Sequence, residues 1–404
     1  MQHGSFQWMK FLNKSIILNK IRTDGPISRA QIAKDTKLTP PTVGSIVKEL
    51  IDQQIVTEST LGSSQGGRKP KMLVINSSGF YVIGIDAGPR NIKFILSDLA
   101  GKVQEGHLIS MEENMSNQTF IDILVHGVRK LLVDYSESEQ QIVGIGVAMH
   151  GAVNVKEGIS LYAPNLNLRN VAIKKELEKN FGYEVKVEND ARAIALAESW
   201  FGSGAETKSM LALNLGSGIG AGLIIDGRLY HGEFDIAGEI GHMTIDLDGD
   251  ICTCGNRGCL QTFASGPAIE RKAEQAINQG KAPVLTRLID GNIHQITGEM
   301  VYEAAISGDN DCRNILEEAG RYVGIGLTNL IHIINPGKII IGGGVANAGE
   351  FLLEPIKATI AEKALTAEAK QTQVTVSELG GRATALGAVA LLLTELFEPV
   401  KNDG

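Results

Sequence analysis

The sequence has no long hydrophobic run and little proline. Its longest apolar runs, such as Ile339–Ile341 and Leu391–Leu393, are far too short to span a bilayer, which takes about 20 residues. The first 30 residues lack the charged, then apolar, then small-residue order of a secretory signal peptide. Only 11 prolines but 47 glycines occur among 404 residues, which favours tight strand–turn–helix junctions over disorder. We therefore expect a folded cytoplasmic protein of two or three domains.

The net charge of −8 is spread unevenly along the chain. Residues 1–75 hold 11 Lys and Arg against 5 Asp and Glu, a net charge of +6, whereas the remainder holds 27 against 41, a net charge of −14. A basic N-terminal segment on an acidic body is typical of a nucleic-acid-binding module joined to a separate ligand domain. Chance clustering of charge is the alternative at this point.

Two helices are expected early in the basic segment. Residues 13–22 carry apolar side chains at helical spacing, and Asp24-Gly25-Pro26 ends that helix. A second helix is expected over 29–35 because Ser28 and Gln31 form a capping box. In that motif Ser28 accepts a hydrogen bond from the Gln31 backbone, and the Gln31 side chain reaches back.

A third helix follows a short turn and has two distinct faces. Thr39 is its expected cap and Pro40 its first residue, where a missing N–H costs nothing. The expected buried stripe is Val43, Ile46, Val47, Leu50 and Ile51. The opposite face, which we expect to contact DNA, carries Thr39, Pro40, Pro41, Thr42, Ser45 and Lys48. Two short helices joined by a tight turn predict a helix-turn-helix whose second helix enters the major groove; a plain helical hairpin is the alternative.

The residues after this third helix favour DNA binding. Strands are expected over 55–59 and 71–76, and the loop between them is rich in glycine and ends in Arg68-Lys69-Pro70. This pattern predicts the basic wing of a winged helix. Arg68 and Lys69 are then placed to contact phosphate or enter a minor groove.

From Tyr81 onward strands and helices alternate, and their order occurs twice. The first series has strands over 81–86, 92–98, 102–108, 143–148 and 185–188, with helices over 119–135, 173–181 and 191–201. The second has strands over 210–215, 221–225, 228–230 and 338–341, with helices over 264–279, 311–333 and 383–397. We predict three domains: a winged helix (1–76), a first α/β lobe (77–200) and a second α/β lobe (201–404). Ligands of such folds bind in the cleft at the strand ends.

Three cysteines and a histidine form the most specific motif. Cys252, Cys254 and Cys259 follow His242 closely, and three thiolates with one imidazole make a closed tetrahedral zinc set. In a cytosolic chain such a cluster indicates metal binding rather than disulfides, and four protein ligands leave no open position, so the zinc is expected to be structural. The fourth cysteine, Cys312, lies outside the motif. Unrelated buried cysteines are the alternative.

Polar residues at two loops form a second constellation. Glu188-Asn189-Asp190 ends a strand and begins a helix, and Glu239-Ile240-Gly241-His242 leads into the metal loop. Carboxylates can accept hydrogen bonds from sugar hydroxyls, while Asn and His donate or accept. A helix-capping Asp190 and a solvated Glu239 are the ordinary alternative on composition alone.

The glycine-rich runs 215–222 and 238–242, with Gly232 between them, resemble the signature of the ROK family of repressors and sugar kinases, and the metal motif is similar too. The likeness extends over essentially the whole chain, and an N-terminal winged helix marks the repressor branch. The runs 66–70 and 163–167 are especially similar to the xylose repressors of Gram-positive bacteria.

This resemblance implies a duplicated α/β actin/hexokinase-like (ribonuclease H-like) ATPase fold behind the winged helix-turn-helix. It also implies a sugar held by Asn189, Asp190, Glu239 and His242, with Asp190 at the position of the kinases' catalytic base and the Gly151 loop closing over the ligand.

The chain departs from the family's kinases where ATP phosphate would bind. The kinases carry Asp-x-Gly-x-Thr after the first strand, but here Pro89 removes an N–H donor and Arg90 replaces Thr. Ser217 stands in the second phosphate loop where Thr is usual, and Gln261 replaces the kinases' sugar-binding Glu, although Gln can still bond a hydroxyl. We interpret these changes as loss of ATP use with retention of sugar binding.

The combined prediction is a sugar-responsive transcriptional repressor that regulates carbohydrate metabolism. It would bind operator DNA as a dimer or higher even oligomer and be released or modulated by a monosaccharide, most simply xylose by resemblance. Glucose and N-acetylated hexosamines share the same contact set. A sugar kinase with an added DNA-binding arm is the alternative; a purely structural interaction protein explains neither the basic wing nor the metal motif.

Overall fold

The computed structural model describes residues 2–61, 70–111, 115–135, 141–205 and 207–397, with the side chains of residues 2–11, 60 and 61 left out. The chain forms two compact units. The first comprises residues 1–150, 155–188 and 388–404, and the second comprises residues 151–154 and 189–387. The three domain ranges expected from sequence stay a prediction.

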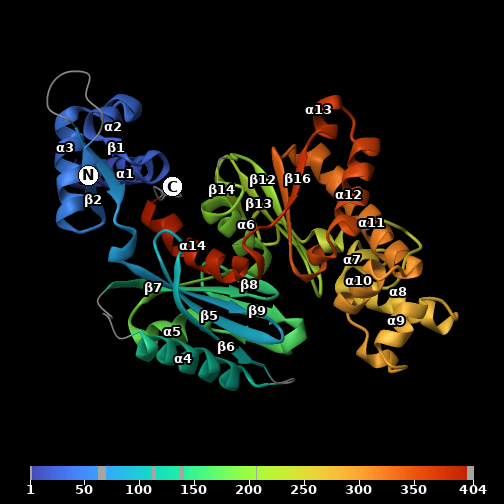
Figure 1. The fold of residues 1–404 in the computed structure, drawn as a ribbon. Helices are drawn as coiled ribbons and strands as arrows, with labels where there is room; N and C mark the ends of the chain where they lie inside the picture. Colours follow the sequence, from blue (N-terminus) through green and yellow to red (C-terminus); the bar gives the residue numbers. More distant parts are fainter. Residues whose placement is uncertain (1, 62–69, 112–114, 136–140, 206, 398–404) are drawn as a thin grey trace. The chain divides into compact units, whose positions relative to one another are not determined.

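A winged helix-turn-helix lies at the N-terminal end of the first unit (Figure 1). Its helices are α1 (Gln2–Asp24), α2 (Arg29–Thr36) and α3 (Pro40–Asp52), so α1 starts well before the expected segment. Strands β1 (Ile27–Ser28), β2 (Val56–Leu61) and β3 (Lys71–Ile75) form an antiparallel sheet in the order β1-β3-β2. The predicted winged helix is confirmed.

Local hydrogen bonds explain where its second and third helices begin. Ser28 Oγ accepts from the Gln31 backbone N–H at 3.2 Å, and Thr39 Oγ1 accepts from the Thr42 N–H at 3.4 Å. The reciprocal half of the predicted capping box is wrong. The Gln31 amide nitrogen donates instead to Asp35 Oδ1 at 2.6 Å, one helical turn ahead, in a charge-assisted hydrogen bond.

The rest of the first unit is a five-stranded mixed sheet in the order β11-β7-β4-β5-β6. Strand β7 runs parallel to β4, while β5 is antiparallel to both β4 and β6. Helices α4 and α5 lie on one side of this sheet and α14 on the other (Figure 1). The bounds are β4 (Tyr81–Ala87), β5 (Asn91–Asp98), β6 (Val103–Ser110), α4 (Asn117–Asp134), β7 (Ile142–Met149), α5 (Ile173–Phe181) and β11 (Glu184–Asn189).

Sequence reasoning missed the short strands between β7 and α5. They are β8 (Ala152–Asn154), β9 (Ile159–Ala163) and β10 (Leu168–Val171), and β9 pairs antiparallel with β10. Asn167 ends the turn between β9 and β10 with a positive φ of 53°, a conformation that asparagine tolerates better than most residues. Short hairpins of this kind give a weak sequence signal.

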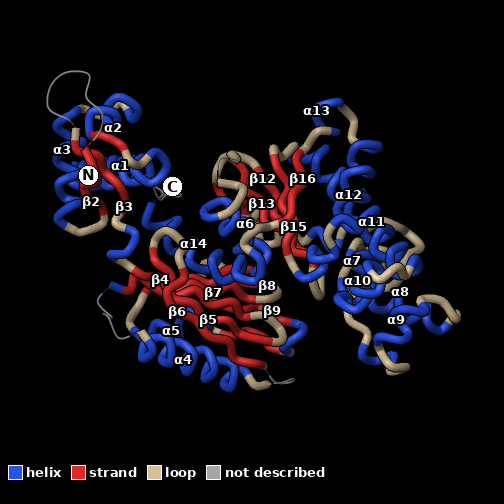
Figure 2. Tube along the Cα trace, viewed as in Figure 1, coloured by secondary structure: helices blue, strands red, loops and turns tan. Residues whose placement is uncertain are grey.

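The second unit repeats the same sheet. Its order is β14-β13-β12-β15-β16, in which β15 runs parallel to β12 and β16, and β13 runs antiparallel to β12 and β14 (Figure 2). This is the strand order of the first sheet, so the predicted duplication is confirmed. The bounds are β12 (Met210–Leu215), β13 (Ile219–Ile225), β14 (Arg228–Tyr230), β15 (Lys338–Gly342) and β16 (Gln373–Val376).

Helices form the remainder of the second unit. Sequence analysis missed the helices α10 and α12 and the strand β16. These segments lack the long apolar periodicity that marks α11. The helices are α6 (Asp190–Phe201), α7 (Gln261–Ala264), α8 (Gly266–Asn278), α9 (Pro283–Leu288), α10 (Gly298–Ile306), α11 (Asn310–Ile334), α12 (Glu350–Lys363) and α13 (Ala367–Lys370).

Helix α14 (Ala383–Phe397) is the most apolar helix of the fold. Within the described residues, the stretch Gly380–Phe397 is long and apolar enough to cross a membrane, but 56% of it is buried and core helices pass the same test. The helix lies so close to β7 that a Cβ on Gly146 would stand 1.8 Å from the Ala388 carbonyl oxygen. Glycine is therefore required at this crossing.

Candidate functional site

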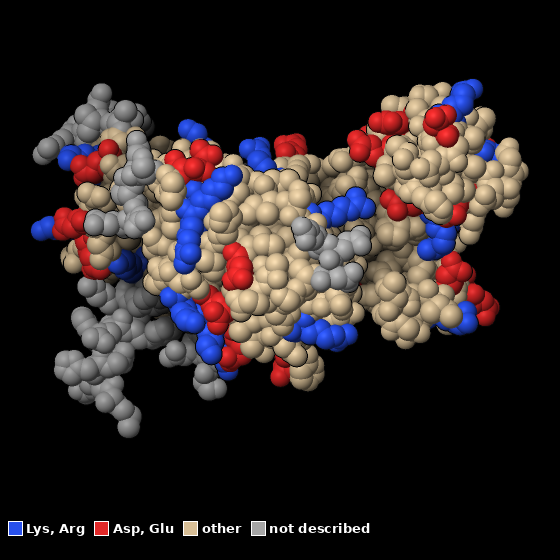
Figure 3. Space-filling view, turned by 90° about the horizontal axis from the view of Figure 1, so that it is seen from below, with Lys and Arg blue, Asp and Glu red and all other residues tan. Residues whose placement is uncertain are grey.

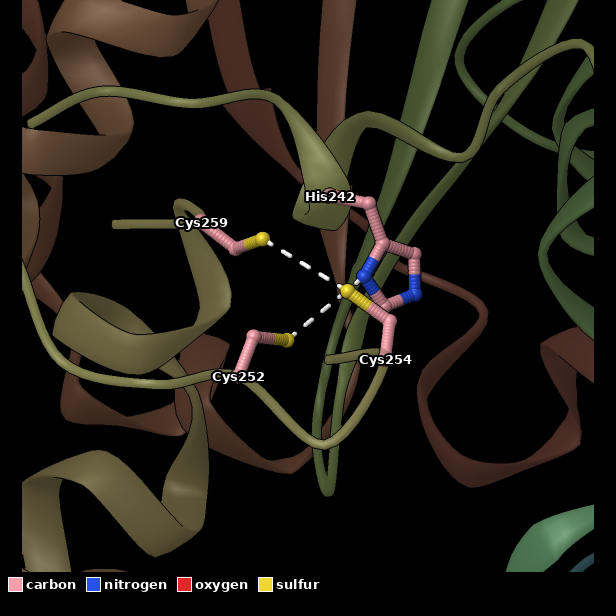
Figure 4. Close-up of side chains that lie close together, drawn as sticks. All are labelled: His242, Cys252, Cys254 and Cys259. Carbon is pink, nitrogen blue, oxygen red and sulfur yellow. Dashed lines mark hydrogen bonds between the residues drawn. The ribbon is translucent and has the colours of Figure 1, made fainter. Parts of the chain in front are cut away.

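Four side chains converge on one point of the second unit (Figure 4). His242 ends a short 3-10 helix (Ile240–His242), and Cys252, Cys254 and Cys259 lie on the loop that follows. The four ligand atoms lie within 4.8 Å of one another. The cluster that the sequence motif predicted is therefore assembled and could hold a metal ion.

The distances and acidities inside this cluster fit a cation-binding site. Cys252 Sγ lies 3.7 Å from His242 Nδ1, and Cys254 Sγ lies 3.8 Å from Cys259 Sγ. Burial would raise the pKa of Cys252, but hydrogen bonds from Cys254 and His242 lower it to about 6. Burial and the neighbouring thiols raise the pKa of Cys259 to about 12. Without a cation the sulfurs cannot all be ionised together, whereas a bound metal would hold them as thiolates.

The loop that carries the cysteines is pinned by backbone contacts. Gly258 has a φ of 64°, and a Cβ there would stand 1.5 Å from the Asp246 carbonyl oxygen, so only glycine fits. The Ile245 N–H donates to the Gly258 carbonyl at 2.7 Å. Arg271, on α8, donates to the Thr262 carbonyl at 2.8 Å just beyond the last cysteine. The ligands are thus held in place by the chain on both sides.

Three of the predicted sugar-binding residues meet at the start of α6. The buried Asn189 is the N-cap: its side-chain oxygen accepts from the N–H groups of Ala191 at 3.0 Å and Arg192 at 3.2 Å. Its amide nitrogen donates to the Gly151 carbonyl at 3.0 Å and to Asp190 Oδ1 at 3.1 Å. Asn189 therefore orients the Asp190 carboxylate and ties it to the Gly151 loop.

The other three predicted residues lie around the metal cluster. The exposed Glu239 precedes the 3-10 helix, and its carbonyl accepts from the His242 N–H at 3.1 Å. Gln261 begins α7, and its amide nitrogen lies 3.2 Å from Cys252 Sγ and 3.3 Å from Thr253 Oγ1. Gln261 thus faces the Cys252 thiol.

Both groups pack on the same end of β13. A Cβ on Gly220 would stand 3.0 Å from the Ala191 Cβ, next to Asp190. A Cβ on Gly241, next to His242, would stand 2.2 Å from the Ile219 carbonyl oxygen. The two contacted positions are consecutive on β13, so the start of α6 and the 3-10 helix that carries His242 pack against the same end of that strand in the second unit.

Sequence reasoning missed Arg192, which supports this neighbourhood. Its side chain is only 1% exposed, and its guanidinium donates to the Asp235 carbonyl at 2.7 Å. That contact fixes the loop before Glu239 to α6. The available signal was a single charged residue in the otherwise apolar run Ala191–Ala197, because a buried arginine must be paired.

The predicted DNA-reading face of α3 is at the surface. Its members Thr39, Pro40, Pro41, Ser45 and Lys48 are exposed, and Thr42 is half-buried beside Thr39, with 2.8 Å between their hydroxyl oxygens. The predicted buried stripe is confirmed for Val43, Ile46, Val47 and Leu50. Arg68 and Lys69 lie outside the described residues. On the face drawn in Figure 3, Lys and Arg are interspersed with Asp and Glu rather than gathered in one basic field.

The turn that contains Pro89 and Arg90 joins β4 and β5 in the first unit. Pro89 is half-buried and Arg90 is exposed, and the Arg90 carbonyl accepts from the Met111 N–H at 2.8 Å. In the second unit, the turn after β12 is closed by the Gly216 N–H donating to the Gly218 carbonyl at 2.9 Å. Gly266 N–H, at the start of α8, donates to the Gly216 carbonyl at 2.8 Å.

Comparison with known proteins accounts for both parts of the chain. The ROK family pattern matches residues 82–395, and a winged helix-turn-helix DNA-binding pattern matches residues 14–57. The chain is 34% identical to the xylose repressor of Caldicellulosiruptor bescii over 395 residues, 98% of each chain. It is 31% identical to the N-acetylglucosamine repressor of Escherichia coli O6:H1, over 97% of this chain and 94% of the relative.

A solved structure shows the same arrangement of elements. A ROK family transcriptional regulator, described as a homologue of the E. coli MLC protein, matches with a TM-score of 0.85 and 31% identity, over 97% of both chains. These similarities confirm the winged helix-turn-helix and the actin/hexokinase-like body. The chain belongs to the ROK family and is a sugar-responsive transcriptional repressor of that family.

Proposed function

We propose that xylose is the sugar to which this repressor responds, and that xylose binding changes the affinity of the repressor for its operator. Similarity to xylose repressors along the full chain supports the choice of sugar. The observation that carries the sugar site is that the chain beside Asp190 and the chain beside His242 pack on consecutive residues of β13. Linkage requires the sugar to bind the DNA-bound and DNA-free forms with different affinity.

The sugar site comprises Asn189, Asp190, Glu239, His242, Gln261 and the Gly151 loop. In this proposal the Asp190 and Glu239 carboxylates accept hydrogen bonds from sugar hydroxyls, which are stronger than bonds between neutral groups. Asn189 presents Asp190 in a fixed orientation because its amide already bridges Asp190 and Gly151. A xylose-specific site must also reject hexoses by leaving no room for their extra hydroxymethyl group.

Operator DNA is read by the exposed face of α3 and by the wing. Thr39, Pro40, Pro41, Thr42, Ser45 and Lys48 supply contacts to base edges and phosphate, and Arg68 and Lys69 contact phosphate or the minor groove. A homodimer would present two such helices to a palindromic operator. Because its ligand is chromosomal DNA, the repressor acts in the cytoplasm.

The metal is proposed to be zinc with a structural role. Tetrahedral zinc with Zn–S bonds of about 2.3 Å places its sulfurs about 3.8 Å apart, and Cys254 Sγ and Cys259 Sγ are 3.8 Å apart. His242 faces the cluster with Nδ1, which leaves its other ring nitrogen to contact a sugar hydroxyl. The zinc would take no part in a chemical reaction. It would hold in place the loop that carries the sugar-site residues Glu239 and His242.

Loss of ATP use is part of the proposal. Pro89 has no N–H to offer a phosphate, and the exposed Arg90 stands where the kinases have threonine. Asp190 then accepts a sugar hydroxyl with no phosphoryl transfer to assist. A working sugar kinase would require the damaged turn to bind ATP nonetheless.

A calorimetric screen of monosaccharides on the full chain, with and without ATP, tests this function. Xylose is expected to bind and to change operator affinity in a gel-shift assay, and ATP is expected to produce neither heat nor sugar phosphate. Binding of glucose or N-acetylglucosamine, without binding of xylose, would show that the effector is that sugar and not xylose. Formation of a sugar phosphate would establish the kinase alternative.

A further inference from the structure

We propose that Gln261 is a positioning residue of the metal cluster, whose side-chain amide donates a hydrogen bond to the Cys252 thiolate and so sets how strongly that sulfur binds the metal. The inference rests on the proposed zinc site and adds a residue outside the four ligands. It gives Gln261 a role that its place in the predicted sugar site does not include.

The side chain is placed for this role by the start of α7. Gln261 follows Cys259 by two residues, and its amide nitrogen lies 3.2 Å from Cys252 Sγ. The same nitrogen lies 3.3 Å from Thr253 Oγ1, so one NH₂ group reaches two neighbouring acceptors of the metal loop. The cluster, the loop and α7 are joined through this one group.

The other end of the amide points toward the glycine-rich turn after β12. A Cβ on Gly218 would stand 3.5 Å from Gln261 Oε1. That turn is itself joined to the start of α8, which follows α7 directly, because the Gly266 N–H donates to the Gly216 carbonyl at 2.8 Å. The side chain therefore spans from the metal loop to this turn, and its nitrogen end is the one that faces sulfur.

The chemistry of the amide decides what this contact does. A thiolate is an acceptor, so an N–H facing it is attractive, whereas an oxygen in the same position would set two electron-rich atoms together. A hydrogen bond to a ligand sulfur withdraws electron density and stabilises the ionised form. Glutamate, which the family's kinases carry here, has no N–H when ionised and would repel Cys252. Glutamine can therefore make a hydrogen bond to this sulfur that an ionised glutamate cannot.

Two substitutions in the full-length protein test this role. Gln261→Glu keeps the shape but replaces the donor with a charged acceptor, and Gln261→Leu removes the donor without adding charge. Zn²⁺ affinity is measured by chelator competition, and the thiolate-to-metal absorption band is recorded after loading with Co²⁺. We expect Gln261→Glu to weaken Zn²⁺ binding about 10–100-fold and Gln261→Leu to weaken it less. The band of both variants should move to longer wavelength, because an unbonded sulfur gives up electron density more easily.

Asn256→Asp is the matched control. Asn256 is exposed on the same loop, so its substitution adds the same charge without removing a donor to sulfur, and it should leave the Co²⁺ band in place. Equal bands and affinities in the wild type and both Gln261 variants would overturn the proposal while the zinc site stands. Absence of metal binding by the wild type would remove the zinc site and this inference together. If Gln261→Glu does not fold, the Leu variant decides the question by its band alone.

Discussion

The two α/β units share one strand order but differ at equivalent turns. After β4 the chain places Pro89, which has no N–H, and the exposed Arg90. After β12 it keeps an internally bonded Gly216–Gly218 turn, which α8 supports through Gly266. The second unit also holds the metal cluster and all six predicted sugar-site residues. The same scaffold thus occurs twice, and the candidate metal and sugar residues lie in the second copy.

Metal removal should cause the largest loss of stability among these predictions. The destabilisation should be confined to the second unit. We expect Cys259→Ser to lose the metal and to destabilise the protein by several kcal/mol, because binding of a structural metal contributes directly to folding. A drop in melting temperature on the order of 10 °C is expected, measured by thermal unfolding with metal analysis. Cys312→Ser, at the buried cysteine outside the cluster, is the control for loss of a thiol and should retain the metal. A Cys259→Ser protein that keeps one zinc per chain would contradict the ligand set.

Substitution of the acid at the start of α6 should separate sensing from DNA binding. Asp190→Asn removes a charged acceptor at the sugar site and should weaken sugar binding about 10–100-fold, with operator affinity unchanged. The measurement is calorimetric titration together with an operator gel shift. Asp86→Asn, near the end of β4 in the first unit, is the comparison for loss of one carboxylate and should leave sugar affinity within about twofold. Unaltered induction in Asp190→Asn would exclude that residue from the site.

The wing should contribute to affinity through charge alone. Arg68→Ala is expected to weaken operator binding severalfold and to reduce the slope of log affinity against log salt by about 0.9. Filter binding at several salt concentrations measures both. Lys281→Ala, at an exposed lysine of the second unit, controls for loss of net positive charge. A slope equal to that of the wild type would remove the wing from the DNA contacts.

Restoring the kinases' residues in the Pro89–Arg90 turn should give the smallest change in ligand binding among these predictions. It tests whether this turn explains the difference between the two units. In the double variant Pro89→Gly and Arg90→Thr, the chain regains an N–H donor and the kinases' threonine. We expect weak ATP binding to become detectable by calorimetry, with the wild type giving no heat. ATP binding of equal strength by the wild type would show that the altered turn is not what prevents ATP use.

Much of the fold could be predicted because its signals are local. Ser28 and Thr39 cap helices whose N–H groups lie three residues ahead, and α3 shows its buried stripe within four turns. The strands beside β4 and β12 were found for the same reason, since each is a short apolar run bounded by turns. The cluster of candidate metal ligands was predictable because three of its four members lie within eight residues.

The elements that sequence analysis missed depend on contacts with other parts of the chain rather than on local signals. β16 and the β9–β10 hairpin have little pattern of their own and are strands because of the neighbours with which they pair. The Gln31 side chain had two possible partners, the Ser28 N–H as a donor to its oxygen and the Asp35 carboxylate as an acceptor from its nitrogen. Its bond to Asp35 depends on the helix already being formed. Sequence reasoning ranks such alternatives poorly, because their energies differ by no more than a hydrogen bond.

The sequence by itself determined the basic winged helix, the repeated order of strands and helices, and the residue types available for metal and sugar. Only the tertiary structure decided that Asn189 holds Asp190 against Gly151, 38 residues away, that Arg192 fixes the loop before Glu239, and that Gln261 turns its N–H toward Cys252. These contacts join residues that the chain alone does not bring together. Their partners are chosen by packing around β13 and α6, where a buried polar group must be paired with whatever acceptor the fold places within reach.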